Sequence, residues 1–264
     1  MAAVQEYIDH LLSLEEYAFS WEELLQKTDA PVSTLRKELD RLTGRNELFN
    51  LRKGFYLILP PRYRPMGKLP VTLYADKLFA YLGKPYYLAF YSAALYHGAA
   101  HQQIQQDYIM TVPPALRDIK KGNARLRFFT TTHWPSRNLM RRTSDAGAFY
   151  LSSPALTMAD LLYHQRWLGG LNRMLANLEE LSEELSVDDI QDLLAWYPHK
   201  STLQRLGYIL EEVGADSSLT EPITDYLQQH RYFPALLSPR PDEKPGSTGN
   251  AWKIDVNVEL ASDI

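Results

Sequence analysis

The first sixty residues constrain the fold most, because several helix signals and one hairpin signal follow each other with short gaps. Apolar residues recur at helical spacing between Val4 and Leu12, which predicts a first helix. Ser20 stands three residues before Glu23, as in a capping box, where each side chain bonds the other's backbone N–H. A second helix is therefore predicted from about residue 21 to 28.

A third helix is predicted after Pro31, because proline is tolerated in the first turn of a helix. Leucines at positions 35, 39 and 42 form one apolar stripe with Val32. Two apolar runs then flank R-K-G, residues 52–54, which indicates a β-hairpin. Three helices followed by a hairpin are typical of a winged helix-turn-helix.

In that fold the third helix enters the major groove of DNA and the hairpin tip contacts the backbone. Arginine and lysine supply the phosphate contacts and direct base readout. Small winged-helix units also serve as protein-interaction domains, so the prediction of DNA binding depends on the charge of this segment. The candidate DNA contacts are Ser33, Thr34, Arg36, Lys37, Arg41, Arg52 and Lys53.

The net charge of −4 is distributed unevenly along the chain. From Lys27 to Lys68 there are ten basic and four acidic residues, a net +6. From Arg117 to Arg142 there are eight basic residues and one acidic residue, a net +7. From Leu171 to the end, seven basic residues face seventeen acidic ones, a net −10. This polarity favours an anionic partner for the first two segments.

The domain boundaries are predicted from composition. Residues 1–60 form the winged helix, residues 61–70 a proline-rich linker, and residues 71–264 a second domain. Strands are expected at 107–112, 126–131 and 148–152, and a last strand within W-K-I-D-V-N-V. Helices are expected at 75–82, 156–167, 171–184, 187–196 and 200–213. The fold class is therefore α+β, with a mixed α/β second domain whose C-terminal half is helical.

The composition indicates a soluble, cytoplasmic protein. The chain has no cysteine, which excludes disulfides and thiolate-bound metals. The first residues lack the basic start and apolar run of a secretory signal, and no stretch is long and apolar enough to span a membrane.

Two histidines raise the question of a metal-dependent hydrolase. His97 and His101 are four residues apart in Y-Y-L-A-F-Y-S-A-A-L-Y-H-G-A-A-H-Q, residues 86–102, which is predicted to contain a helix. A zinc hydrolase places a glutamate after the first histidine, but Gly98 stands there. No spacing points to a third ligand such as His133 or His164. We expect His97 and His101 to form hydrogen bonds in a closely packed helix, with metal-dependent hydrolysis as the weaker alternative.

Other catalytic patterns are missing from the sequence. It contains no G-x-S-x-G turn and no phosphate-binding glycine loop. Asp160 lies on an apolar helix and is expected to be a buried, hydrogen-bonded carboxylate. The basic run 117–142 is either a second nucleic-acid surface or an edge strand protected by charge. No enzyme activity and no cofactor are predicted.

Together, several motifs resemble the AbiEi family. They are R-K-G-F-Y-L-I-L-P-P-R-Y-R-P-M-G-K-L-P, the string Y-Y-L-A-F-Y-S-A-A-L-Y-H-G-A-A-H-Q, Y-L-S-S-P-A-L-T-M-A-D-L-L, a following G-G-L, and R-L-G-Y-I-L-E. The resemblance extends from about residue 6 to 257. Its most specific part is the H-G-A-A-H-Q string. The motif residues given a structural or contact role are Ser92, His97, Gly98, His101, Gln102 and Asp160.

The resemblance implies an antitoxin and transcriptional regulator of a bacterial abortive-infection, phage-defence toxin–antitoxin pair. Its winged helix would bind inverted repeats in its own promoter and repress transcription. Its second domain would oppose a nucleotidyltransferase-like toxin without a stable complex, as in the type IV group. No catalytic or metal residue is carried over. An alternative is a winged-helix repressor whose second domain binds a small effector.

Overall fold

A computed structural model describes residues 3–99, 105–240, 242–246 and 248–261. Contacts group the chain into two compact units. The N-terminal unit comprises residues 1–87, 105–131 and 141–150, and the C-terminal unit comprises 88–104, 132–140 and 151–264. The predicted boundaries at 60 and 70 rest on composition rather than contacts, and they stay a prediction.

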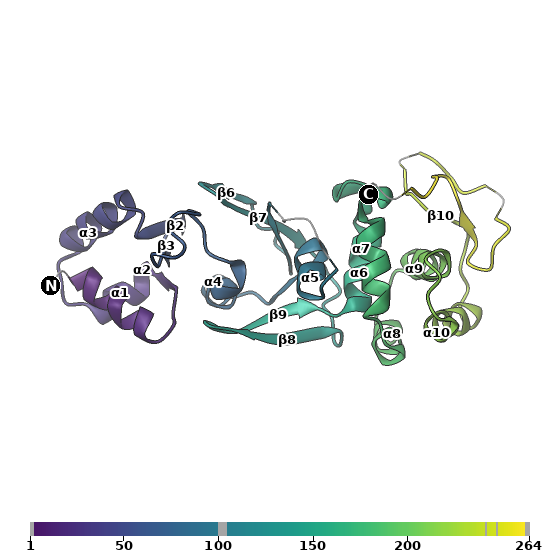
Figure 1. The fold of residues 1–264 in the computed structure, drawn as a ribbon, viewed down its shortest axis with the longest axis horizontal. Helices are drawn as coiled ribbons and strands as arrows, with labels where there is room; N and C mark the ends of the chain where they lie inside the picture. The colour runs from purple at the N-terminus through teal and green to yellow at the C-terminus, as the bar shows by residue number, and fades with distance from the viewer. Residues whose placement is uncertain (1–2, 100–104, 241, 247, 262–264) are drawn as a thin grey trace. The chain divides into compact units, whose positions relative to one another are not determined.

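The N-terminal unit begins with three helices and a three-stranded sheet (Figure 1). Its sheet is antiparallel with the order β1-β3-β2. Apolar residues of all three helices and the sheet share one core, which includes Val4, Phe19, Leu24 and Leu35. The elements are α1 (Ala3–Ser13), β1 (Ala18–Ser20), α2 (Trp21–Lys27), α3 (Val32–Gly44), β2 (Leu48–Arg52) and β3 (Phe55–Ile58).

The predicted capping box is confirmed at the start of α2. The Glu23 N–H donates to Ser20 Oγ at 3.1 Å, and the Ser20 N–H donates to Glu23 Oε2 at 2.7 Å. Strand β1 was not predicted, because its three residues show no alternation and all are buried. It exists through pairing with β3, which is a contact between positions far apart in the sequence.

The proline-rich segment forms a series of turns that are held by backbone hydrogen bonds and ion pairs. Backbone bonds close turns onto Pro60 and Tyr63. Arg62 pairs with Asp145 at 3.1 Å, and Arg64 pairs with Glu47 at 3.4 Å. After this segment come η1 (Val71–Leu73) and α4 (Ala75–Leu82).

A six-stranded sheet has the order β6-β7-β5-β4-β9-β8. Strands β5 and β7 are parallel, β4 and β9 are parallel, and β6 and β7 form an antiparallel hairpin. The edge strands β6 and β8 lie in the basic run, which confirms the edge-strand interpretation; charge at an edge discourages pairing with another chain. The strands are β4 (Tyr86–Leu88), β5 (Asp107–Thr111), β6 (Ile119–Lys121), β7 (Ala124–Thr130), β8 (Leu139–Ser144) and β9 (Gly147–Ser152).

The C-terminal unit is mainly helical, so the mixed α+β class with a helical second half is confirmed. Helix α10 was not predicted, because Pro222 lies within it. The expected last strand is reduced to two residues of β11, parallel to β10. The elements are α5 (Phe90–Tyr96), α6 (Pro154–Tyr163), η2 (Gln165–Trp167), α7 (Leu171–Glu183), α8 (Val187–Leu194), α9 (Lys200–Glu212), α10 (Ser217–Gln228), β10 (Ala235–Leu236) and β11 (Ile254–Asp255).

Within the described ranges, no helix has both the length and the apolar character needed to cross a bilayer.

Buried side chains of α9 attach the C-terminal segment. Gln204 donates to the carbonyls of Phe233 and Trp252, and Arg205 Nε donates to the Leu236 carbonyl at 2.8 Å. The Trp252 ring lies directly on Gly207 of α9, where a Cβ atom would overlap it. A glycine is therefore required at this crossing.

We predict that Gly207→Ala destabilises the protein by about 1–3 kcal/mol, because the Trp252 ring has to move from a packed site. Urea unfolding followed by tryptophan fluorescence measures the change. Gly44→Ala is the matched control, since nothing lies within 4 Å of its new methyl group. It should be neutral or stabilising by up to about 1 kcal/mol, since alanine is the better helix former. Wild-type stability of Gly207→Ala would contradict the packing argument.

Candidate nucleic-acid interface

Helix α3 presents a polar surface opposite its buried leucine stripe. Leu35, Leu39 and Leu42 are buried in the core. The five polar residues proposed as DNA contacts on this helix are all exposed, namely Ser33, Thr34, Arg36, Lys37 and Arg41. Ser33, Lys37 and Arg41 are four residues apart in turn, so they form one row along the helix. Arg36 lies beside this row, with its guanidinium 5.8 Å from the Trp21 ring centroid.

The hairpin tip is fixed by a residue of α4. Gly54 has a φ of +76° and a Cβ there would come within 2.9 Å of the Tyr81 hydroxyl oxygen. That hydroxyl donates to the Lys53 carbonyl at 3.3 Å. The Lys53 side chain is exposed and Arg52 is half-buried. The tip therefore presents one fully solvated cation on a constrained backbone.

The β6–β7 hairpin packs against β2 within the same unit. Lys121 Nζ donates to Asn50 Oδ1 at 2.9 Å and lies 5.9 Å from the Phe49 ring centroid. Asn123 Nδ2 donates to the Met66 carbonyl at 2.8 Å. Lys120 and Arg125 are opposite each other in the register, and both are exposed. Part of the basic run 117–142 thus adjoins the predicted DNA-contact hairpin.

The cationic side chains of α3 and of the hairpin tip can bind a polyanion. Among the described residues, no ion pair joins Arg36, Lys37, Arg41, Arg52 or Lys53 to an acid. By contrast, Arg62 and Arg64 are each paired with a carboxylate. The two pairs join positions 83 and 17 residues apart, so no local pattern in the sequence indicates them.

His97 has a structural position, and the helix around it is shorter than expected. Residues 86–88 form β4, and α5 ends at Tyr96, so His97 follows the helix. Gly98 has a φ of +79°, which continues the chain away from the helix. His97 Nε2 lies 2.8 Å from the Ser152 carbonyl oxygen, in a buried environment. Ser92 is also buried, while His101 and Gln102 lie outside the described residues.

The described residues contain no group of three or more metal-ligating side chains. His133 and His164, considered above as third ligands, instead belong to an aromatic cluster with Tyr163 and His199. Burial, reinforced by nearby His199, lowers the pKa of His164 to about 4. A neutral imidazole among aromatic rings is consistent with packing.

Asp160 is buried on α6, as expected. Burial and then the Asp160 carboxylate raise the pKa of Tyr197 well above its usual range.

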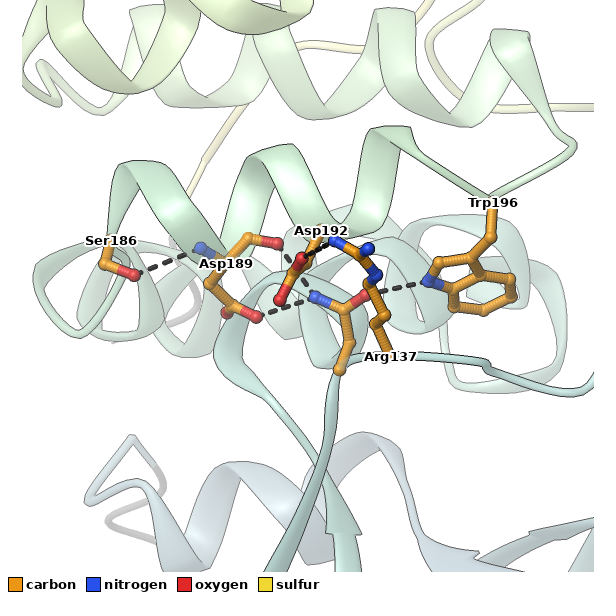
Figure 2. Close-up of polar contacts among 6 residues, drawn as sticks. Arg137, Ser186, Asp189, Asp192 and Trp196 are labelled. Carbon is orange, nitrogen blue, oxygen red and sulfur yellow. Dashed lines mark hydrogen bonds and ion pairs between the residues drawn. The ribbon is translucent and has the colours of Figure 1, made fainter.

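Asn138 and Asp189 form a polar centre that no sequence pattern indicated (Figure 2). Asn138 has a φ of +62° and donates to both the backbone carbonyl and Oδ1 of Asp189, at 2.8 and 2.7 Å. Its own Oδ1 accepts from Trp196 Nε1 at 2.8 Å. Asp189 Oδ2 accepts from the Ala155 N–H at the start of α6. Beside this centre, Arg137 pairs with Asp192 (Figure 2).

This centre joins three segments. Ser186 caps α8 by accepting from the Asp189 N–H, so the same residue is held at its backbone and its side chain (Figure 2). The Asp189 side chain in turn accepts from Asn138 in the segment before β8 and from the Ala155 N–H in the first turn of α6. Positive φ is tolerated by asparagine, but the sequence pattern shows neither that angle nor the distant partners.

Comparison with known families links part of this α+β protein to antitoxins. Residues 87–212 match the model described as the AbiEi antitoxin C-terminal domain. The family resemblance is confirmed over this range. The matched range contains His97, Asp160 and the Asn138–Asp189 centre.

The whole chain also resembles a solved structure. The crystal structure of the RV2827C protein from Mycobacterium tuberculosis aligns with a TM-score of 0.64 and 15% sequence identity. The alignment covers 96% of this chain and 91% of that chain, and at this identity it shows a shared fold. Comparison with curated proteins gives no match.

We predict that Asp189→Ala destabilises the protein by about 1–3 kcal/mol, because it leaves the Ala155 N–H without its acceptor and removes one of the two acceptors of the Asn138 amide. Thermal and urea unfolding measure the loss. Asp188→Ala is the matched control, an exposed acid one residue earlier on α8, and should cost less than about 1 kcal/mol. Equal costs for the two variants would show that helix charge, rather than the polar centre, explains the effect.

The half-buried His164 should make the stability of the protein depend on pH under acidic conditions. Its folded pKa of about 4 lies below its reference value of 6.5, so the unfolded chain binds the proton more readily. The contribution of neutral His164 is present above pH 6.5 and is lost as the pH falls toward 4. It amounts to up to about 3 kcal/mol.

The unfolding free energy, measured at several values between pH 7.5 and 4.5, should therefore fall less steeply in His164→Gln than in the wild type. His10→Gln, at an exposed histidine of α1, should keep the wild-type slope. An unchanged slope in His164→Gln would disprove the assignment.

Proposed function

We propose that this antitoxin is also a DNA-binding autorepressor whose N-terminal elements form a winged helix-turn-helix. The observation that carries the proposal is the exposed cationic row of α3 beside a cationic hairpin tip. Helix α3 would lie in the major groove of each half of an inverted repeat, with one protomer on each half-site. The family match over residues 87–212 supports the antitoxin role.

Arg36 and Lys37 are the best candidates for base readout, because long cationic side chains near the start of a recognition helix reach guanine edges. Ser33, Thr34 and Arg41 would contact phosphates or bases along the same groove. Arg52 and Lys53 would hold the adjoining backbone. Lys120 and Arg125 of the β6–β7 hairpin extend the cationic surface beyond β2, and would add phosphate contacts.

The partner opposed by the C-terminal unit would be a nucleotidyltransferase-like toxin, counteracted without a stable complex. We assign this protein no catalytic activity, and the roles of Ser92, His97, Gly98 and Asp160 are structural or contact roles. Growth of cells that produce the neighbouring gene's product, with and without this chain, tests the antitoxin role directly.

The effector-regulated repressor is the second candidate. A groove of about 600 Å³ is lined by residues of α1, α2 and α4, including Tyr7, Glu23 and Lys77. It lies in the N-terminal unit, whereas the effector hypothesis placed the ligand in the second domain. Lys77 already pairs there with Glu16 and Glu23, at 3.2 and 2.8 Å. The autorepressor therefore has the stronger support.

Two double variants test DNA binding on a duplex of the chain's own promoter. Arg36→Ala with Lys37→Ala should weaken binding by about tenfold or more, because base and phosphate contacts are both lost. Arg52→Ala with Lys53→Ala should mainly flatten the dependence of affinity on salt, by about one unit of slope for each lost phosphate contact. Gel shifts at several salt concentrations measure both effects.

The matched control is Arg240→Ala with Lys244→Ala, which removes the same charge from an exposed C-terminal loop. Its affinity should stay within about twofold of the wild type at moderate salt, where charges beyond a Debye length are screened. Wild-type gel shifts from both interface variants would end the proposal.

A further inference from the structure

A second surface with nucleic-acid chemistry lies on the C-terminal unit, at the start of α9. The Tyr163 and His199 rings stack with centroids 4.2 Å apart, and the His133 ring meets His199 edge-on at 5.8 Å. Lys200 Nζ donates to the Arg231 carbonyl at 3.0 Å. The Arg231 guanidinium lies 4.9 Å from the Phe233 ring centroid. We call these six residues the α9 surface: His133, Tyr163, His199, Lys200, Arg231 and Phe233.

The two aromatic rings at its ends are unusually exposed. Phe233 is 64% exposed and Tyr163 is 45% exposed. Both are large rings that proteins normally bury, so the exposure of the two rings on one surface indicates a contact surface. Histidine and cation side chains separate them, so the surface alternates between rings and positive or protonatable groups.

The α9 surface is also electrostatically distinct from its surroundings. The chain from Leu171 onward has a net charge of −10. Yet the segments 132–138, 163–168, 196–206 and 229–235, which supply this surface, contain no aspartate or glutamate. A cationic surface within an acidic half of the chain favours an anionic ligand at that location.

We propose that the α9 surface binds single-stranded nucleic acid. Unpaired bases stack on exposed rings such as Tyr163 and Phe233, while Lys200 and Arg231 attract the phosphates between them. A duplex hides the faces of its bases and would leave both rings without a partner. A purely apolar protein segment would leave the cations without one. This site is separate from the α3 surface and does not depend on the proposed operator binding.

Fluorescence anisotropy of a labelled oligothymidylate of about twelve nucleotides tests the site in the full chain. Tyr163→Ala with Phe233→Ala should weaken binding about tenfold or more, because each lost stacking contact has an effect of that size. Tyr163→Phe with Phe233→Tyr keeps both rings and should bind like the wild type. Arg240→Ala with Lys244→Ala, which changes exposed cations outside both proposed surfaces, should bind the oligonucleotide like the wild type.

Photocrosslinking of a bromodeoxyuridine oligonucleotide to the wild-type protein provides a readout that needs no variant. Crosslinks at Tyr163 or Phe233 are expected. Crosslinks confined to α3 and the β2–β3 tip would overturn the proposal, as would unchanged affinity of the ring-deletion variant. Thymidine monophosphate that competes as well as the oligomer would exclude a strand as the ligand, and binding of a protein instead of any oligonucleotide would do the same.

Discussion

Burial of the leucine stripe of α3 determines what the N-terminal unit can present to solvent. Leu35, Leu39 and Leu42 are at most 3% exposed, in a core shared with α1 and the sheet. Because the stripe faces inward, the polar residues between its leucines have to face outward. Each fully buried leucine contributes about 1.5–3 kcal/mol, so this orientation is strongly fixed. The cationic row is thus a consequence of packing as much as of its own chemistry.

Local signals predicted much of this fold. The Ser20–Glu23 capping box, the α3 stripe and the β2–β3 turn each depend on residues within a few positions of one another, and each is present. Short strands could not be predicted, because they form only through pairing with another strand. Strand β1 pairs with β3, and β10 pairs with β11. Helix α10 escaped because Pro222 is an apparent breaker that the helix tolerates.

The candidate sites show the same difference between local signals, which could be predicted, and contacts between distant positions, which could not. Exposed cations on α3 follow from helical periodicity, so they could be selected from the sequence. Contacts between distant positions could not be predicted in this way. Lys121 contacts Asn50 across seventy-one positions, and Asn138 contacts Asp189 across fifty-one. The α9 surface joins four separate segments, none of which is distinctive alone. The pairing of Arg62 with Asp145 likewise joins positions far apart in the sequence.

The contact between Tyr81 and the β2–β3 tip reduces the conformational entropy that the tip can lose when it binds a partner. A hairpin tip in solution samples many conformations, and a ligand that selects one of them loses affinity to that ordering. Here the Tyr81 hydroxyl already holds the Lys53 carbonyl, against a glycine that leaves room for it. A residue of α4 therefore rigidifies the tip before any partner arrives. A chain shortened to residues 1–60 would keep the proposed DNA contacts of α3 and of the hairpin tip, yet lose this preorganisation.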